Sequence, residues 1–353
     1  MKSRNACALT AMLIAGSFIL GTAAFAQVAP WPVRGKLIGK DGDKAEDVSG
    51  MACATPSGFP RMCLIVDDEV QGAQIVILNE GGLIAGDTIA LIDDKFEGKA
   101  LELDGEAVAF ADGFFYIVGS HGHPRDADHK LDPVKDAAKI AANIKASSKV
   151  VRVKLDASMI DAEGKLKADA KPEIAVSDKL RPKLQEWPPL QPFVDKRLDE
   201  NGLTIEGAAV RNGKLYVGMR GPLLNGDRDV APVYSASLYS LFEGGHADPT
   251  TVDLRLGEAG RGIRDLVAID KGFLVLAGPG TEVEGDYTVF FWDGASVNAA
   301  PLGTLPKFAD EKGRQVRPEG LLPLDSSKEG LRLLVLFDRG QEGEPRPVTV
   351  RNP

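Results

Sequence analysis

The sequence predicts an all-β protein, and three features carry that prediction. Short stretches of alternating apolar residues are bounded by turn residues, which is typical of strands. The 353 residues include 39 Gly and 22 Pro, which indicates many tight turns. Helical periodicity is convincing only over residues 133–147. A pair of strands then recurs along the chain, and this repeat predicts how the strands are arranged.

Each copy of the repeat has a polar or acidic residue, a small residue, an apolar strand, a glycine turn and a second apolar strand. The polar residues are 57, 100, 59 and 54 residues apart, so only the second copy carries a long insertion. A spacing in the fifties suits one four-stranded sheet with its loops. We therefore predict a β-propeller with a helical and loop insertion at about 121–202, in its second blade. The five copies are marked by Ser49, Glu106, Glu206, Asp265 and Glu319.

Five blades are favoured over six, although a sixth blade within residues 157–202 is left open. Five prolines make that stretch a poor sheet. The fifth copy lacks an obvious last strand, and Val33–Lys40 could complete it by closing the ring. The competing fold is a β-sandwich or a pair of β domains. The recurring acid argues against it, because only a propeller brings the same position of successive sheets to one axial channel.

The first residues have the features of an export signal. Lys2 and Arg4 precede a mostly apolar run, and Ala24-Phe25-Ala26 is a suitable cleavage site. We predict a signal peptide at residues 1–26 and one propeller domain at 27–353, located in the periplasm or secreted. No later stretch is long and apolar enough to span a membrane. A net charge of −9 without a basic tract also argues against nucleic-acid binding.

Cleavage would leave Cys53 and Cys63 as the only cysteines of the mature chain. They lie on consecutive antiparallel strands of the first copy. Directly opposed residues in such a pair have Cβ atoms about 4.5–5.5 Å apart, which is near the distance that a disulfide needs. An oxidising compartment permits the bond, so we expect Cys53 to pair with Cys63. Two buried thiols are the alternative, if the facing is off by one residue.

The recurring carboxylates are the candidate functional site. Glu106, Glu206, Asp265 and Glu319 would repel one another in a channel unless a cation or arginines offset their charge. A hard cation such as Ca²⁺ takes six to eight oxygen ligands, and these four carboxylates are its candidate ligands. Arginines could supply the charge instead. The alternative to a site is that each acid caps its own blade through backbone amides. Further candidates at the ends of the strands are Asp68, His121, Arg220 and Arg264.

The chain resembles a family of bacterial propellers catalogued as domain-of-unknown-function family 3616. The motifs that carry the resemblance run through nearly all of the mature chain, and its Glu-Gly pair is shared with esterase-like phytase propellers. The resemblance implies a propeller and no particular activity. The motifs are Gly105-Glu106-Ala107 with Val118–His121, Asn201–Val210 with Gly218–Pro222, Gly260–Leu266 with Leu276–Pro279, and Pro318-Glu319-Gly320.

Two functions compete at this point. The first is an exported propeller that binds a small ligand or a partner at an acid-rich axial site. The second is a metal-assisted, Ca²⁺-dependent hydrolase of phosphate or carboxylate esters, in which Arg220 and Arg264 hold the anion. The sequence contains no nucleophile elbow, zinc-protease helix or phosphate loop. We therefore lean toward binding.

Overall fold

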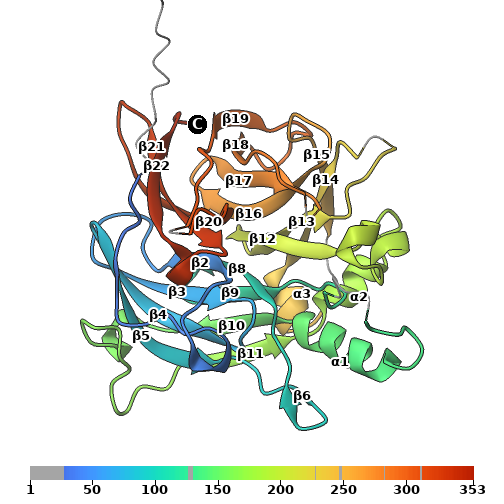
Figure 1. The fold of residues 1–353 in the computed structure, drawn as a ribbon, viewed down its shortest axis with the longest axis horizontal. Coiled ribbons are helices and arrows are strands. Elements are labelled where there is room, and N and C mark those ends of the chain that lie inside the picture. The colour runs from blue at the N-terminus through green and yellow to red at the C-terminus, as the bar shows by residue number, and fades with distance from the viewer. Residues whose placement is uncertain (1–27, 126–129, 227, 246–248, 282, 311) are drawn as a thin grey trace, which may run out of the picture.

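Five β-sheets surround a common centre in the computed structural model, which describes residues 28–125, 130–226, 228–245, 249–281, 283–310 and 312–353 (Figure 1). The expected signal peptide at residues 1–26 lies outside the described residues. The first strand of each sheet is innermost and contacts the first strands of the two neighbouring sheets. The fold is the predicted five-bladed β-propeller. Among the described residues, no helix has the length and apolar character needed to span a bilayer.

Blade 1 has short connections between its strands, whereas blade 2 has the longest connections of the described chain. Blade 1 has four antiparallel strands and one added parallel strand, and blade 2 has four antiparallel strands. Blade 1 consists of β2 (Val48–Cys53), β3 (Arg61–Asp67), β4 (Gly72–Asn79), β5 (Gly82–Ala90) and β1 (Val33–Arg34). Blade 2 consists of β8 (Gly105–Ala111), β9 (Phe114–Gly119), β10 (Val150–Lys154) and β11 (Glu173–Ser177), and a small hairpin of β6 (Lys95–Phe96) and β7 (Lys99–Ala100) precedes it.

The other three blades are more regular. Blades 3 and 4 have four antiparallel strands each, and blade 5 has three. Blade 3 consists of β12 (Thr204–Arg211), β13 (Lys214–Gly221), β14 (Ala231–Ser237) and β15 (Thr250–Leu254), with the short helix α3 (Leu238–Phe242) after β14. Blade 4 consists of β16 (Arg261–Ile269), β17 (Gly272–Pro279), β18 (Thr288–Trp292) and β19 (Ala300–Thr304), and blade 5 of β20 (Arg317–Ser326), β21 (Leu331–Asp338) and β22 (Arg346–Val350).

Apolar side chains fill the space between each pair of neighbouring blades, in five clusters. Successive residues of a strand point to opposite faces of the sheet, and here both faces are covered. In β3, Leu64 packs toward blade 2, whereas Ile65 packs toward blade 5. This double burial explains why the second strand of each repeat is a continuous apolar run and not an alternating one.

The end of the chain differs from the prediction. Val33–Lys40 does not complete the fifth blade, because β1 (Val33–Arg34) pairs with β5 of blade 1 in parallel. Blade 5 therefore keeps three strands, and its backbone joins blade 1 through a bridge between Asp47 and Asp338. No separate sheet forms within residues 157–202, whose one strand is the outer strand of blade 2. The sixth blade that the sequence left open is absent from the described part of the chain.

The insertion of blade 2 lies at the side of the ring near blade 3 (Figure 1). It holds two helices, α1 (Ala137–Ser147) and α2 (Leu180–Gln185). The first agrees with the helical periodicity of residues 133–147. Leu180 and Leu184 of α2 pack into the cluster between blades 2 and 3, so the insertion is part of the core there.

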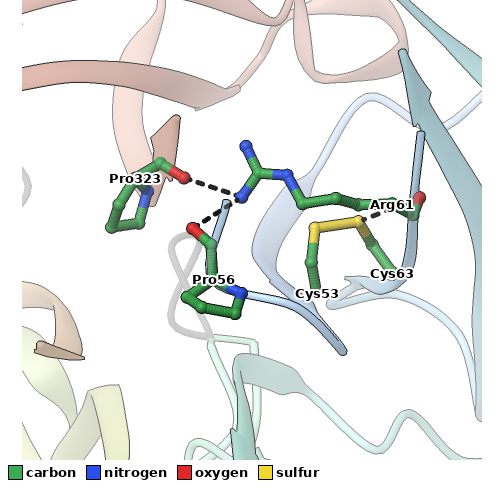
Figure 2. Close-up of a disulfide and its surroundings, with 5 residues drawn as sticks. All are labelled: Cys53, Pro56, Arg61, Cys63 and Pro323. Atoms are coloured by element: carbon green, nitrogen blue, oxygen red, sulfur yellow. Dashed lines mark hydrogen bonds between the residues drawn. A yellow bond between two sulfur atoms is a disulfide. The ribbon is translucent and has the colours of Figure 1, made fainter. Parts of the chain in front are cut away.

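A disulfide joins Cys53 to Cys63 (Figure 2). The two residues are directly opposed in the pairing of β2 with β3, at the end of these strands farther from Ser49. The bond closes the turn that contains Pro56 and Pro60, and both cysteines belong to the apolar cluster between blades 1 and 5.

Candidate functional site

The innermost strand of every blade contains a β-bulge at the same place. In each pairing of the first strand with the second, the register skips one residue. Bulges re-aim a side chain, and here they mark the five equivalent positions of the ring. In four blades the skipped residue is the one that marks the repeat in the sequence, but in blade 4 it is Arg264 and not Asp265. The five bulged residues are Ser49, Glu106, Glu206, Arg264 and Glu319.

Close contact between inner strands explains the small residue that follows the acid. A Cβ atom on Gly207 would lie 2.8 Å from the Ile263 side chain and 3.0 Å from the Asp265 backbone. A Cβ atom on Gly50 would lie 2.9 Å from the Cα atom of Ala107. Two of these three distances are below 3.0 Å, so a Cβ atom at either glycine would displace its neighbour. The glycines after Glu206 and Ser49 thus let the backbone approach the next blade closely.

Buried arginines neutralise the bulged acids of blades 3 and 5. The Glu206 carboxylate binds Arg220 through a 2.8 Å contact and the Nε atom of Arg264 at 2.9 Å. Arg264 also binds Glu319. All of these side chains are at most 6% exposed, so their charges are compensated inside the protein and not by water. We call Glu206, Arg220, Arg264 and Glu319 the paired network.

Asp265 has a different role from the one expected for a metal ligand. Its two carboxylate oxygens accept hydrogen bonds from the backbone amides of Leu266 and Leu321, each at 2.7 Å. It therefore links blade 4 to blade 5, as in the alternative in which an acid caps backbone amides. Burial raises the pKa of Asp265 to about 7, and the two amide hydrogen bonds oppose that shift.

Blades 1 and 2 bring together three carboxylates, which we call the acidic cluster. Asp68 follows β3, Asp104 precedes β8, and Glu106 is the bulged residue of β8. One carboxylate oxygen from each lies within 4.8 Å of the others. Glu106 is 3% exposed, and its Oε1 atom has no hydrogen-bond partner among the described residues. Among the described residues, the positive group that forms ion pairs with the cluster is the Arg125 guanidinium, 3.5 Å from Asp68 and 4.0 Å from Glu106, and its side chain is half exposed.

The electrostatics of the acidic cluster follow from this shortage of positive charge. Burial raises the pKa of Asp68 and of Glu106 well above the usual range, and for Glu106 the charges of Glu206, Asp104 and Asp68 add to the effect. Burial also raises the pKa of Asp104, against hydrogen bonding by Ser120. Arg125 lowers all three pKa values, but it does not cancel the shifts. Each carboxyl group therefore holds a proton more readily than it would in water.

The structure thus divides the four carboxylates that were the candidate metal ligands. Glu206 and Glu319 are held by arginines and Asp265 by backbone amides, and only Glu106 joins a cluster that a cation could enter. Asp104 was missed by sequence reasoning, because it lies just before β8 with a left-handed backbone (φ 54°) and is not part of the repeated strand pattern. Arg125 was missed because nothing in the insertion marks one arginine as a partner of the channel.

His121 is buried and does not join the acidic cluster through any hydrogen bond or ion pair that the structure describes. Its Nδ1 atom is 2.8 Å from the carbonyl oxygen of Gly119, and its Nε2 atom has no partner among the described residues. Burial lowers the pKa of His121 to about 3, so the ring is neutral. Its carbonyl oxygen accepts a hydrogen bond from Arg181 of α2, which ties the insertion to blade 2.

A cavity of about 420 Å³ lies between residues 37–48 and the strands of blade 1. Its lining is mostly apolar, with polar groups from Gln71, Gln74 and Asp67 among others. Burial raises the pKa of Asp67 to about 6. Asp67 and Asp68 are consecutive, so one end of β3 supplies an acid to this cavity and an acid to the acidic cluster.

Similarity to solved structures is low in sequence. The chain matches a virginiamycin B lyase from Staphylococcus aureus at 10% identity, with 87% of this chain and 71% of that one covered and a TM-score of 0.32. It matches an exo-β-1,3-galactanase from Phanerochaete chrysosporium at 8% identity, with 92% and 66% covered and a TM-score of 0.40. An endo-arabinase from Bacteroides thetaiotaomicron matches at 12% identity, with 91% and 98% covered and a TM-score of 0.36.

No curated protein matches the chain. These comparisons do not confirm the expected likeness to esterase-like phytase propellers. A family model, in contrast, covers most of the chain, from the second strand of blade 1 to the last strand of blade 5. Its match to residues 61–346 shows that the chain belongs to the family described as Protein of unknown function (DUF3616).

Proposed function

We propose that the protein is an exported binding propeller whose acidic cluster takes a divalent cation, with Ca²⁺ as the expected ion. The proposal is carried by one observation: the buried Oε1 atom of Glu106 has no hydrogen-bond partner among the described residues and faces two further carboxylates. A buried acceptor without a partner costs about 1–3 kcal/mol, and more when it is charged. A cation at this point would remove both that cost and the repulsion among the three acids.

The number and kind of ligands fit a hard cation. Asp68, Asp104 and Glu106 offer one oxygen each at mutual distances of at most 4.8 Å. Ca²⁺ takes six to eight oxygens, so water or a ligand would supply the rest. A small ligand with carboxylate or phosphate oxygens would thus bind at the open coordination positions. The cavity of about 420 Å³ is a separate feature, because none of Asp68, Asp104 and Glu106 lines it.

Calorimetric titration of the purified, chelator-treated chain with Ca²⁺ tests this function. We expect a single site in the wild type and a loss of at least tenfold in affinity in Glu106→Gln. Glu69→Gln is the matched control, because Glu69 carries the same charge one residue after Asp68 but pairs with the exposed Lys40. Elemental analysis should find calcium at one ion per chain. Titration without heat at millimolar Ca²⁺ in the wild type would contradict the proposal.

Metal-assisted hydrolysis of esters is the second candidate, and one observation favours it. Burial raises the pKa values of Asp68 and Glu106, and a carboxyl group of the cluster that keeps its proton and does not ligate the cation can act as a general acid. A panel of phosphate and carboxylate esters decides between the candidates. Turnover that requires Ca²⁺ and is lost in Glu106→Gln supports the hydrolase, and Ca²⁺ binding without turnover supports the binding protein.

Export is part of the proposal and has its own test. Amino-terminal sequencing of the protein from a periplasmic fraction should begin at Gln27, directly after the expected cleavage site. Thiol titration of the same material, denatured and not reduced, should find no free thiol, because Cys53 and Cys63 are joined. Closing so short a loop is expected to stabilise the fold by about 2–3 kcal/mol. Two titratable thiols per mature chain would show that the bond does not form.

A further inference from the structure

The cavity of about 420 Å³ in blade 1 reaches the apolar clusters on both faces of that blade. Of its lining residues, Leu37, Val48 and Ile65 belong to the cluster between blades 1 and 5, and Val66 and Ile89 to the cluster between blades 1 and 2. Each of these five residues is at most 5% exposed. The cavity therefore extends between buried apolar side chains and is not a shallow depression of the surface.

One wall of the cavity is the segment 37–48, which is fixed to the first blade and to the last. The Oε1 atom of Gln74 in β4 accepts a hydrogen bond from the backbone amide of Ile38 at 2.8 Å. The backbone amide of Leu37 donates to the Glu342 carboxylate, which follows β21, at 3.1 Å. Because this wall is held by the protein itself, a ligand that enters the cavity does not have to order it.

The lining suits an apolar body better than it suits water. The side-chain nitrogen of Gln74 donates to the carbonyl oxygens of Lys36, at 3.0 Å, and of Gly86, at 2.9 Å, so both of its N–H groups are used within the protein. An apolar cavity of about 150 Å³ stays dry and binds benzene. The cavity of blade 1 is larger, and we therefore expect it to have room for a body of two rings.

The charges of the lining select the polar end of such a molecule. Among the described residues that line the cavity, the charged ones are Asp67 and Asp93, and none is Lys, Arg or His. Asp93 is exposed and pairs with Lys95 at 2.7 Å. Asp67 is 5% exposed and forms no ion pair in the described part of the chain. Its carboxylate accepts hydrogen bonds from the backbone amides of Glu69, at 3.1 Å, and Asp47, at 3.3 Å, which leaves lone pairs for a further donor.

We propose that this cavity binds a small lipophilic amine, with its hydrocarbon body among the apolar side chains and its ammonium group at Asp67. The ammonium group supplies the positive charge and the hydrogen-bond donors that Asp67 does not receive from another side chain. A carboxylate of the same shape would bring a like charge to Asp67, so the same residue excludes anions. The site does not depend on the proposed Ca²⁺ site, because no member of the acidic cluster lines the cavity.

Calorimetric titration in chelator at pH 7 tests the proposal with three probes that share a naphthyl body: 2-(1-naphthyl)ethylamine, 2-(1-naphthyl)ethanol and 3-(1-naphthyl)propanoate. We expect the amine to bind about tenfold more tightly than the alcohol, because a hydrogen bond between charged groups is stronger than one from a neutral donor. The carboxylate should bind most weakly. Asp67→Asn should remove the advantage of the amine. Glu69→Gln is the control and should keep it, since Glu69 carries the same charge two residues away but does not line the cavity.

A second variant and a crystal soaked in the amine locate the binding. Val70 lines the cavity from the turn between β3 and β4 and is partly exposed, so Val70→Trp should narrow the cavity and weaken the binding of all three probes. In the crystal, we expect the naphthyl group in the cavity and the amine nitrogen within hydrogen-bond distance of the Asp67 carboxylate. That result supports the proposal also when Asp67→Asn does not fold. Titration of the wild type without heat at millimolar amine overturns it, and so does an affinity for the alcohol or the carboxylate that equals the affinity for the amine.

Discussion

The acidic cluster and the paired network occupy the same kind of position and differ only in the charges around them. Glu106 and Glu206 are both bulged residues of an innermost strand, and both are buried. Glu206 is held by Arg220 and Arg264, whereas Glu106 faces Asp68 and Asp104 and has only the half-exposed Arg125 nearby. Buried arginines therefore neutralise the acids of blades 3 and 5, whereas the acidic cluster between blades 1 and 2 has no buried arginine partner among the described residues.

This difference teaches where to look for function in a ring of equivalent residues. A recurring acid shows that a channel exists, but it does not show which acids are available to a ligand. Those that already have buried arginine partners hold the blades together. The acids whose ion-pair partner among the described residues is the half-exposed Arg125 are the ones that a cation from solution could stabilise, and here they lie between blades 1 and 2.

The largest expected effect is the loss of Arg264 from the paired network. Arg264→Met leaves the Glu206 and Glu319 carboxylates buried with one partner fewer, and breaking a buried ion pair in this way costs about 3–5 kcal/mol. Urea unfolding measures the loss. Glu258→Gln, which removes an exposed partner of Arg261, is the control and should change stability by less than about 1 kcal/mol. A similar small effect in Arg264→Met would show that the network does not hold the ring together.

A second prediction separates the two regions by their response to calcium. Glu319→Gln should destabilise the protein by about 1.5–3 kcal/mol, the range for a hydrogen bond to a charged group, because it loses its contact with Arg264. The loss should be the same in Ca²⁺ and in chelator. Glu106→Gln should be neutral or stabilising in chelator and should abolish stabilisation by Ca²⁺. A calcium-dependent effect of Glu319→Gln would return that residue to the metal site and remove the distinction between the two regions.

The sequence predicts the blades well because one apolar pattern is repeated five times and each copy is long enough to set its own register. It does not predict which residue occupies the bulge of blade 4. Arg264 and Asp265 are consecutive, and only the pairing of β16 with β17 decides that Arg264 is skipped. This shift by one residue places Arg264 instead of Asp265 at the bulge, where Arg264 pairs with Glu206 and Glu319.

The members of the acidic cluster were only partly predictable for a similar reason. Asp68 and Glu106 lie at the ends of repeated strands, and the repeat identifies them. Arg125 belongs to the insertion, which has no counterpart in the other copies. The repeat also could not predict which blade β1 joins. Its two residues show too little periodicity to favour the edge of blade 1 or that of blade 5.

The dependence of stability on pH provides a third comparison. Asp68 and Glu106 have pKa values raised in the folded state, and those of Asp47 and Asp265 are raised to about 7, in all four cases mainly by burial. The folded state then binds more protons than the unfolded state between about pH 4 and pH 7, so stability should fall as pH rises through this window. His121, whose pKa is lowered to about 3, opposes this trend within the window, but it is one group against these four. Asp132 and Asp293, whose pKa values are also lowered, titrate below the window.

Calcium should change that pH profile. Its binding needs ionised carboxylates, so the stabilisation by Ca²⁺ should grow as pH rises from about 5 to 8. Urea unfolding at pH 5, 6, 7 and 8, in chelator and in Ca²⁺, measures both trends. In chelator, Glu106→Gln should reduce the fall of stability with rising pH but not abolish it, because Asp47 and Asp265 still contribute. Stability in chelator that rises between pH 5 and 7 would contradict the raised pKa values.

The smallest expected effect concerns Arg125, which is the only positive group that ion-pairs with the acidic cluster in the described residues. Its guanidinium lies 3.5 Å from Asp68 and 4.0 Å from Glu106, so it competes with a cation for the same carboxylates. The side chain is half exposed, and pairs of that kind contribute about 0–1 kcal/mol. Arg125→Met should therefore increase the Ca²⁺ affinity by up to about fivefold, since 1.4 kcal/mol corresponds to tenfold. Calorimetric titration at pH 7 measures this, with Arg152→Met as a control that keeps the wild-type affinity. If Arg125→Met instead weakens Ca²⁺ binding, Arg125 orders the cluster for the ion, and the contrast between a paired and an unpaired side of the ring would have to be given up.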